Sequence, residues 1–77
     1  MLKDLLEYLA KSLVDNPAEV RVFVSETDTT VLLELSVDKD DVGKVIGKQG
    51  RIARALRTIV KASAVRDGKR VVVEIVD

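Results

Sequence analysis

The spacing of the apolar residues changes along the chain, and this change constrains the fold more than any other feature. Apolar side chains recur at the interval of an amphipathic helix in residues 2–14, 38–46 and 51–65. They instead alternate with polar side chains, as in strands with one buried face, in residues 19–26, 29–37 and 70–76. The sequence therefore predicts the element order α-β-β-α-α-β.

A chain of 77 residues favours one small domain around a single core, and such a domain buries about 60% of its unfolded surface. The predicted elements fit an α+β domain over residues 1–77, in which a three-stranded sheet carries helices on one face. The covered face of the sheet is expected to hold Val20, Val22, Val24, Val31, Leu33, Leu35, Val37, Val71, Val73 and Ile75. The helices are expected to bury Leu5, Leu9, Val42, Ile46, Leu56 and Ile59. The pattern leaves the strand order open.

The other face of the predicted sheet also carries apolar side chains. These are Phe23, Leu32, Val72 and Val76. Scattered exposed apolar residues are normal on a protein surface, whereas four in one small sheet are enough for a patch that binds a partner or a second copy. Both interpretations remain open from the sequence.

The composition argues against an enzyme, a metal site or a cofactor site. The chain has no histidine and no cysteine, and its glycine-rich segment contains no pair of carboxylates. No apolar run approaches the ~20 residues that a membrane span needs, and no signal-peptide pattern begins the chain. We therefore expect a cytoplasmic binding protein that needs no cofactor and no membrane.

The charges sum to zero but are unevenly distributed. Residues 1–38 carry three basic and eight acidic side chains, and residues 39–70 carry ten basic and three acidic ones. A surface potential follows such local sums, so the second segment predicts a strongly positive region. The alternative is that the charges only keep a small domain in solution.

The glycine-rich start of the helix at residues 51–65 suggests a ligand for that region. The expected N-cap, Gly50, has no side-chain oxygen for the free N–H groups of residues 50–53, unlike serine or aspartate. Lys48, Arg51 and Arg54 surround this helix start, whereas acidic residues begin the helix at residues 38–46. Free amides, a positive dipole end and cations together predict a phosphate site.

The glycine spacing decides which kind of phosphate ligand fits. A nucleotide P-loop needs four residues between its glycines and a following Lys-Ser or Lys-Thr pair, and a dinucleotide fingerprint needs G-x-G-x-x-G. Gly43, Gly47 and Gly50 fit neither pattern, and no strand precedes them. The remaining candidate is a helix–GxxG–helix, which clamps the backbone of single-stranded RNA.

The segment "VIGKQGRIARAL", residues 45–56, resembles the KH domain, and the element order is similar to the type II arrangement. The length of the chain and the longer segment "VIGKQGRIARALRTIV", residues 45–60, are similar to those of the KhpA family. Its members are small bacterial RNA-binding proteins with a single KH domain. In one departure, many KH sequences place a large aliphatic residue where this chain has Ala53.

The resemblance implies an RNA-binding site with ten residues: Lys44, Val45, Ile46, Gly47, Lys48, Gln49, Gly50, Arg51, Ile52 and Arg54. The two glycines would shape the loop, and the two residues between them would face the RNA backbone. The apolar members would form a groove for bases, and the outer cations would form its rim. Core packing is the alternative for the apolar members, and solvated surface charge is the alternative for the cations.

Two further groups of cations follow the glycine-rich segment. Arg57 and Lys61 fit an ordinary solvent-facing side of the helix. The loop at residues 66–70 is a candidate for the other lip of the groove, with Lys69 and Arg70 in reach.

The rarity of aromatic residues predicts a weak RNA site. Tyr8 and Phe23 are the only two, and neither lies in the basic segment, so base stacking worth about 1–3 kcal/mol per base is missing. We expect weak, salt-dependent binding of single-stranded RNA in post-transcriptional regulation or as an RNA chaperone. The resemblance implies a homodimer or a heterodimer with a KhpB-like KH protein as partners. The alternative function is a dimerisation or interaction scaffold with little RNA binding of its own.

Overall fold

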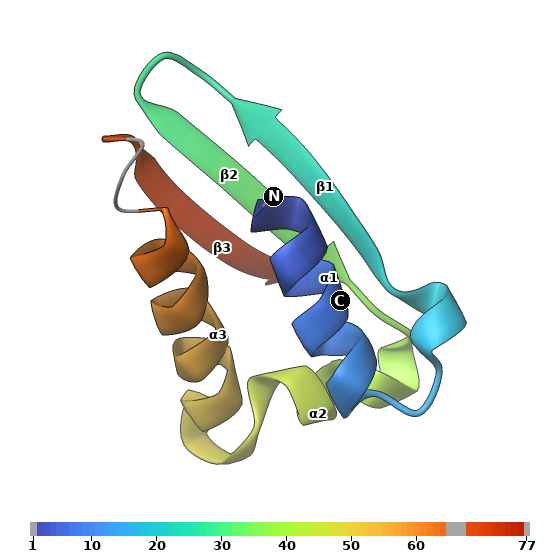
Figure 1. The fold of residues 1–77 in the computed structure, drawn as a ribbon. Helices are drawn as coiled ribbons and strands as arrows, with labels where there is room; N and C mark the ends of the chain where they lie inside the picture. The colour runs from blue at the N-terminus through green and yellow to red at the C-terminus, as the bar shows by residue number, and fades with distance from the viewer. Residues whose placement is uncertain (1, 65–67, 77) are drawn as a thin grey trace.

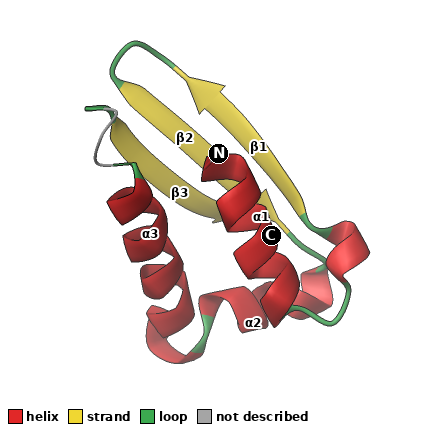
Figure 2. Ribbon diagram, in the orientation of Figure 1, coloured by secondary structure: helices red, strands yellow, loops and turns green. Residues whose placement is uncertain are grey.

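The structure, a computed structural model, describes residues 2–64 and 68–76 and confirms the predicted order of helices and strands (Figures 1 and 2). Its long helices are α1 (Leu2–Leu13) and α3 (Arg51–Ser63), and the short α2 (Val42–Ile46) lies between them in the chain. The strands are β1 (Arg21–Glu26), β2 (Thr30–Ser36) and β3 (Arg70–Val76). Single 3₁₀ turns lie at η1 (Pro17–Glu19), η2 (Lys39–Asp41) and η3 (Lys48–Gly50).

The sheet has the order β1-β2-β3 and mixes two kinds of pairing. β1 and β2 form an antiparallel hairpin, in which Arg21 lies opposite Ser36. β3 runs parallel to β2, with Thr30 opposite Arg70. Parallel neighbours need a crossover connection, and here α2 and α3 provide it. The crossover therefore fixes where the turn between these two helices lies.

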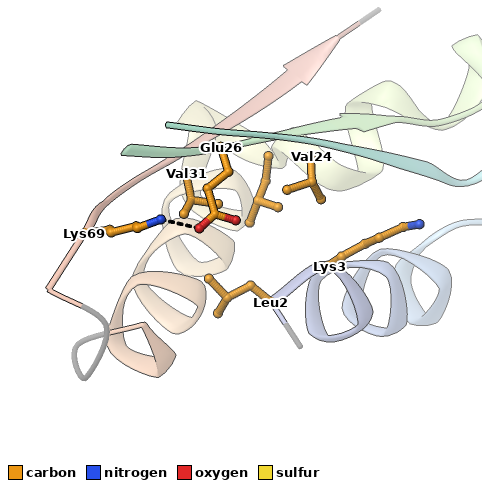
Figure 3. A pocket seen from close by; sticks show the side chains of 7 residues that line it. Leu2, Lys3, Val24, Glu26, Val31 and Lys69 are labelled. Atoms are coloured by element: carbon orange, nitrogen blue, oxygen red, sulfur yellow. Dashed lines mark hydrogen bonds and ion pairs between the residues drawn. The ribbon is translucent and has the colours of Figure 1, made fainter. Parts of the chain in front are cut away.

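The helices α1 and α3 pack on one face of the sheet, so the molecule has two layers with the core between them (Figure 2). The alternating residues predicted for this face are buried in all three strands, with two exceptions. Ile75 is only partly buried, and Val24 is 47% exposed. The prediction for Val24 was wrong because its side chain lines an open hollow, which Leu2 and Lys3 of α1 border without filling it (Figure 3).

The helices contribute fewer buried residues than their spacing predicts. Leu56 is buried, and the predicted residues of α1 together with Val42 pack partly buried against the core. Ile46 and Ile59 are 37% and 43% exposed, so their assignment to the core was wrong. Ile46 is the last residue of a helix of only five residues, and Ile59 lies at the margin of an apolar stripe that the sheet does not fully cover.

The second face of the sheet is uncovered, as expected for this two-layer fold (Figure 1). Phe23 is 58% exposed there, and its apolar neighbours on the same face, Leu32, Val72 and Val76, are half-buried. Within the described part of the chain, every helix is too short or too polar to span a lipid bilayer.

A buried carboxylate joins α1 to the start of α2. Asp41 is 2% exposed, and its oxygens accept hydrogen bonds from the backbone N–H groups of Asp15 at 3.3 Å and Asn16 at 3.0 Å. Asp38 caps η2 by accepting from the Asp40 N–H at 2.9 Å, and the Asn16 amide also donates to it. These acids therefore position the helix that precedes the glycine-rich turn.

Candidate nucleic-acid interface

The turn between α2 and α3 has a backbone path that depends on its glycines. Gly47 ends α2 with φ 75° and ψ 173°, a combination that residues with a Cβ atom essentially never adopt. Gln49 and Gly50 also have positive φ values, 59° and 74°. The N–H of Gly47 donates to the Gly43 carbonyl at 2.9 Å, and the N–H of Gly50 donates to the Gly47 carbonyl at 3.2 Å. The chain thus folds back between two helices over very few residues.

The two glycines of the GxxG sequence meet different constraints. A Cβ atom on Gly47 would lie 2.6 Å from Cγ1 of Ile52, so this glycine lets the first turn of α3 pack against the end of α2. A Cβ atom on Gly50 would meet nothing within 4 Å. The space beside Gly50 is therefore open to a ligand that approaches the backbone.

The start of α3 has the electrostatic character predicted from the sequence, with one correction. Its N-cap is Gly50, no side chain caps it, and its first turn has no acidic residue. The prediction of free amides at residues 50–53 was wrong at its first two positions, because the Gly50 and Arg51 N–H groups donate to carbonyls within the turn. Within the described residues, the N–H groups of Lys48 and Gln49 have no backbone acceptor. The open donors thus lie in the loop and at the start of α3, where no backbone acceptor is found for the N–H groups of Ile52 and Ala53 among the described residues.

The four cations assigned to the site differ in exposure and in their hydrogen-bond and ion-pair partners. Lys48 and Arg51 are exposed, and neither forms an ion pair with a described carboxylate. Arg54 donates from its guanidinium to the Gln49 carbonyl at 3.1 Å, which braces the loop from α3. Lys44 pairs with the carboxylates of Asp15 and Asp41, and the hydrogen bond to Asp15 raises the pKa of Lys44. The positive charge of the loop therefore comes mainly from Lys48, Arg51 and Arg54.

The apolar residues beside the loop divide into buried and accessible ones. Val45 is fully buried and belongs to the core, so it supports the site from beneath. Ile46 is exposed at the end of α2, and Ile52 is half-buried behind Gly47. Ala53, which departs from the usual KH pattern, is buried against the core. Ile46 and Ile52 are thus the accessible apolar side chains beside the loop.

A groove lies between α3 and β3, and the sequence did not reveal the role of Arg57 in it. Arg57, expected on an ordinary solvent-facing side, is partly buried and donates from Nε to the Val73 carbonyl at 3.1 Å. Lys61 and Arg70 line the same groove. This contact depends on β3 lying beside α3. The sequence did not predict that arrangement, because it left the strand order open.

The predicted second lip of the groove lies far from the loop. Residues 66 and 67 fall outside the described residues. Lys69 and Arg70 lie beside the C-terminal end of α3, whereas the glycine-rich turn lies at its N-terminal end (Figure 1). Lys69 pairs with Glu26 (Figure 3). It also donates to the Thr27 carbonyl at 3.0 Å. Lys69 and Arg70 thus border the far end of the α3–β3 groove and not the loop.

Nothing in the described residues provides a metal site, since no three carboxylate, histidine or cysteine side chains converge. The arrangement around the loop suits an anion instead. Its donors are backbone N–H groups, a helix N-terminus and guanidinium or ammonium groups.

Comparison with known proteins places this geometry in a family. The model of the KhpA/KhpB KH domain matches residues 3–75. RNA-binding protein KhpA of Clostridium acetobutylicum is 59% identical over 75 residues, which cover 97% of this chain and 100% of the relative. RNA-binding protein KhpA of Aquifex aeolicus is 59% identical over 76 residues, covering 99% of this chain and 96% of the relative. The Bacillus subtilis protein of the same name is 51% identical over 76 residues, covering 99% and 94%.

Solved structures show the same fold at low sequence identity. Era in complex with MgGDPNP and nucleotides 1506–1542 of 16S ribosomal RNA superimposes with a TM-score of 0.71 at 17% identity. The match covers 96% of this chain and 28% of the Era chain. An Aquifex aeolicus Era variant bound to GDP and aluminium fluoride also gives a TM-score of 0.71, at 16% identity, over 96% of this chain and 29% of Era. The predicted type II KH-like fold is confirmed.

Proposed function

Because the chain belongs to the KhpA/KhpB KH-domain family, we propose that it binds a short single-stranded segment of RNA through the turn between α2 and α3. The observation that carries this proposal is the backbone of the turn. Three residues with positive φ, Gly47, Gln49 and Gly50, leave the Lys48 and Gln49 amides open beside exposed cations. The similar proteins of Clostridium acetobutylicum and Bacillus subtilis are both named RNA-binding protein KhpA.

The site residues act in three groups in this proposal. The Lys48 and Gln49 amides and the exposed cations Lys48 and Arg51 hold a phosphate. Arg54 keeps the loop in its binding conformation through the Gln49 carbonyl. Ile46 and Ile52 contact a base, and the fully buried Val45 supports them.

The remaining members of the predicted site have supporting roles. Gly47 and Gly50 allow the turn and the approach of the RNA backbone. Lys44 binds two carboxylates of its own chain, so it positions α2 and contributes little charge to the RNA. The α3–β3 groove, with Arg57 and Lys61, receives the nucleotides that follow the loop.

A single loop with two accessible aliphatic residues gives weak binding, because no described aromatic side chain lies at the site. We propose that useful affinity comes from a second KH domain, either in a second copy of this chain or in a KhpB-like partner. Linked sites raise the effective concentration of each at the RNA. The chain itself would act as one KH domain in post-transcriptional regulation.

The test compares the variant Lys48→Asp/Gln49→Asp with the unmodified chain in binding to a labelled single-stranded RNA of mixed sequence. We expect unchanged far-UV circular dichroism and at least about a hundredfold weaker binding, since two carboxylates would face phosphate. The matched control is Lys3→Asp/Ser25→Asp, which changes the net charge equally at exposed positions.

The control variant is expected to bind RNA nearly as well as the unmodified chain. Equal loss in both variants would show that only net charge matters, and the loop would not be the site. Unchanged RNA affinity of the loop variant would favour the scaffold function over RNA binding.

A further inference from the structure

The two free edges of the sheet differ in how their outward backbone groups are used. The N–H of Thr27 donates to the Thr30 carbonyl, and the register pairs Arg21 with Ser36. Bonding alternates along an antiparallel pair. The N–H and C=O groups of Val22, Val24 and Glu26 therefore point away from β2, toward solvent.

The edge of β3 is blocked at one carbonyl by a side chain, whereas the described outward groups of β1 are not blocked. The outward groups of β3 belong to Val71, Val73 and Ile75, because the N–H of Arg70 donates to the Thr29 carbonyl of the β2 side. The Arg57 side chain occupies the Val73 carbonyl. Across the described residues, no side chain bonds the outward groups of β1, and Figure 1 shows no element beyond this strand. An unprotected edge is a template for another strand.

The unprotected strand also carries exposed apolar side chains on both of its faces. Phe23 is 58% exposed on the uncovered face of the sheet, and Val24 is 47% exposed on the helical side. Beside Val24 the side chains of Leu2, Lys3 and Val31 border a hollow, which the Glu26–Lys69 ion pair closes on the far side (Figure 3). A strand added to β1 would place a side chain over this hollow.

The charged side chains beside the edge of β1 indicate which charge a partner segment should carry. The surface between α1 and β1 is bordered by Lys3, Glu7, Lys11 and Arg21. Glu7 is neutralised by its ion pair with Lys11, which lowers the pKa of Glu7. Neither Lys3 nor Arg21 pairs with a carboxylate of the described residues. The rim is therefore positive, which favours an occupant with acidic side chains.

We propose that the free edge of β1 binds an extended, acidic segment of a partner protein as a fourth strand of the sheet. Main-chain hydrogen bonds to Val22 and Val24 supply the pairing, and alternate side chains contact Phe23 on one face and the hollow beside Val24 on the other. Acidic side chains near the ends of the segment reach Lys3 and Arg21. This surface is separate from the glycine-rich turn, which lies at the opposite end of the molecule from the hairpin (Figure 1).

The test uses a capped synthetic peptide with a central run of alternating valine and threonine and a glutamate at each end. Amide hydrogen exchange of the full chain is followed by NMR with and without the peptide. We expect exchange at Val22 and Val24 to slow by about tenfold or more at saturation, because these N–H groups gain acceptors. The variant Lys3→Glu/Arg21→Glu is expected to weaken binding by about tenfold or more.

The control variant Lys48→Glu/Arg51→Glu carries the same change of charge on the RNA loop and is expected to bind the peptide normally. Unchanged exchange at Val22 and Val24 at about 1 mM peptide would overturn the proposal. Equal binding of a peptide with lysine at each end would also overturn it. Protection of these amides by raising the protein concentration alone, or by single-stranded RNA, would instead assign the edge to a second copy or to RNA.

Discussion

Gly47 and Gly50 look alike in the sequence, yet the structure predicts different costs for replacing them. Gly47→Ala combines a glycine-only backbone conformation with a 2.6 Å approach to Ile52, so we expect about 2–5 kcal/mol of lost stability. Gly50→Ala has open space around it and a left-handed conformation, which costs about 1 kcal/mol. Urea denaturation of both variants measures the difference. Equal destabilisation would contradict this account of the turn.

The buried carboxylate of Asp41 gives a second residue-scale prediction. Asp41→Asn replaces an acceptor oxygen with a donor that faces backbone N–H groups of Asp15 and Asn16. We expect the free energy of unfolding to fall by about 1–3 kcal/mol. The neighbouring variant Asp40→Asn, at an exposed position, is the control and should change stability by less than about 0.5 kcal/mol.

The capping carboxylate of Asp38 predicts a pH dependence. The Asp40 N–H and the Asn16 amide hold the pKa of Asp38 below its ordinary value. A lowered pKa means that this carboxylate stabilises the fold fully above its unfolded pKa and loses the contribution as the pH falls through the folded value. Urea titrations should therefore show that Asp38→Asn is less stable at neutral pH, and that the difference shrinks in acid. A constant difference would contradict this role.

At the residue scale, the sequence predicted which residues form the loop better than it predicted their burial and their ion pairs. The motif located the loop because glycine spacing and charge are local properties. It could not reveal that Lys44 would be paired, because its partner Asp15 lies in a distant segment. Nor could it separate the buried Val45 from the exposed Ile46, since both are apolar neighbours before the turn.

At the scale of elements, a side-chain hydrogen bond joins α3 to β3 and can be tested by mutation. Arg57→Ala removes the donor to the Val73 carbonyl, and we expect a loss of about 1–2 kcal/mol because the donor is charged. The control is Lys61→Ala on the same helix, an exposed position without a hydrogen bond in the described residues. It should change stability by less than about 0.5 kcal/mol. Equal effects in thermal or urea unfolding would show that Arg57 acts only through its charge.

The elements themselves were largely predictable, whereas their pairing was not. The bounds of β3 agree with the alternation of residues 70–76, and helices α1 and α3 end only one or two residues before their predicted ends. Periodicity reports which face of a segment is apolar, so it located these elements. Which strand lies beside β2 depends on the crossover, and periodicity carries no information about that.

At the scale of the whole molecule, a net charge of zero does not prevent strong salt dependence of RNA binding. The cations around α3 are separated from the acidic first half of the chain, so phosphate contacts release counterions locally. For about two to four phosphate contacts, the logarithmic slope of affinity against salt should be about −1.4 to −2.8. Filter binding or fluorescence anisotropy at several salt concentrations measures it. A slope near zero would contradict a phosphate-clamping loop.

The crossover between β2 and β3 also sets an order of events during synthesis. Thr30 pairs with Arg70 and Ser36 with Val76, so β2 gains its second neighbour only after α2, the turn and α3 have been made. Distant pairings of this kind close late, since the chain entropy of the intervening segment must be lost first. The nascent chain therefore exposes one side of β2 until β3 has left the ribosome. A ribosome stalled before that point would present a hairpin and three helices with an incomplete sheet.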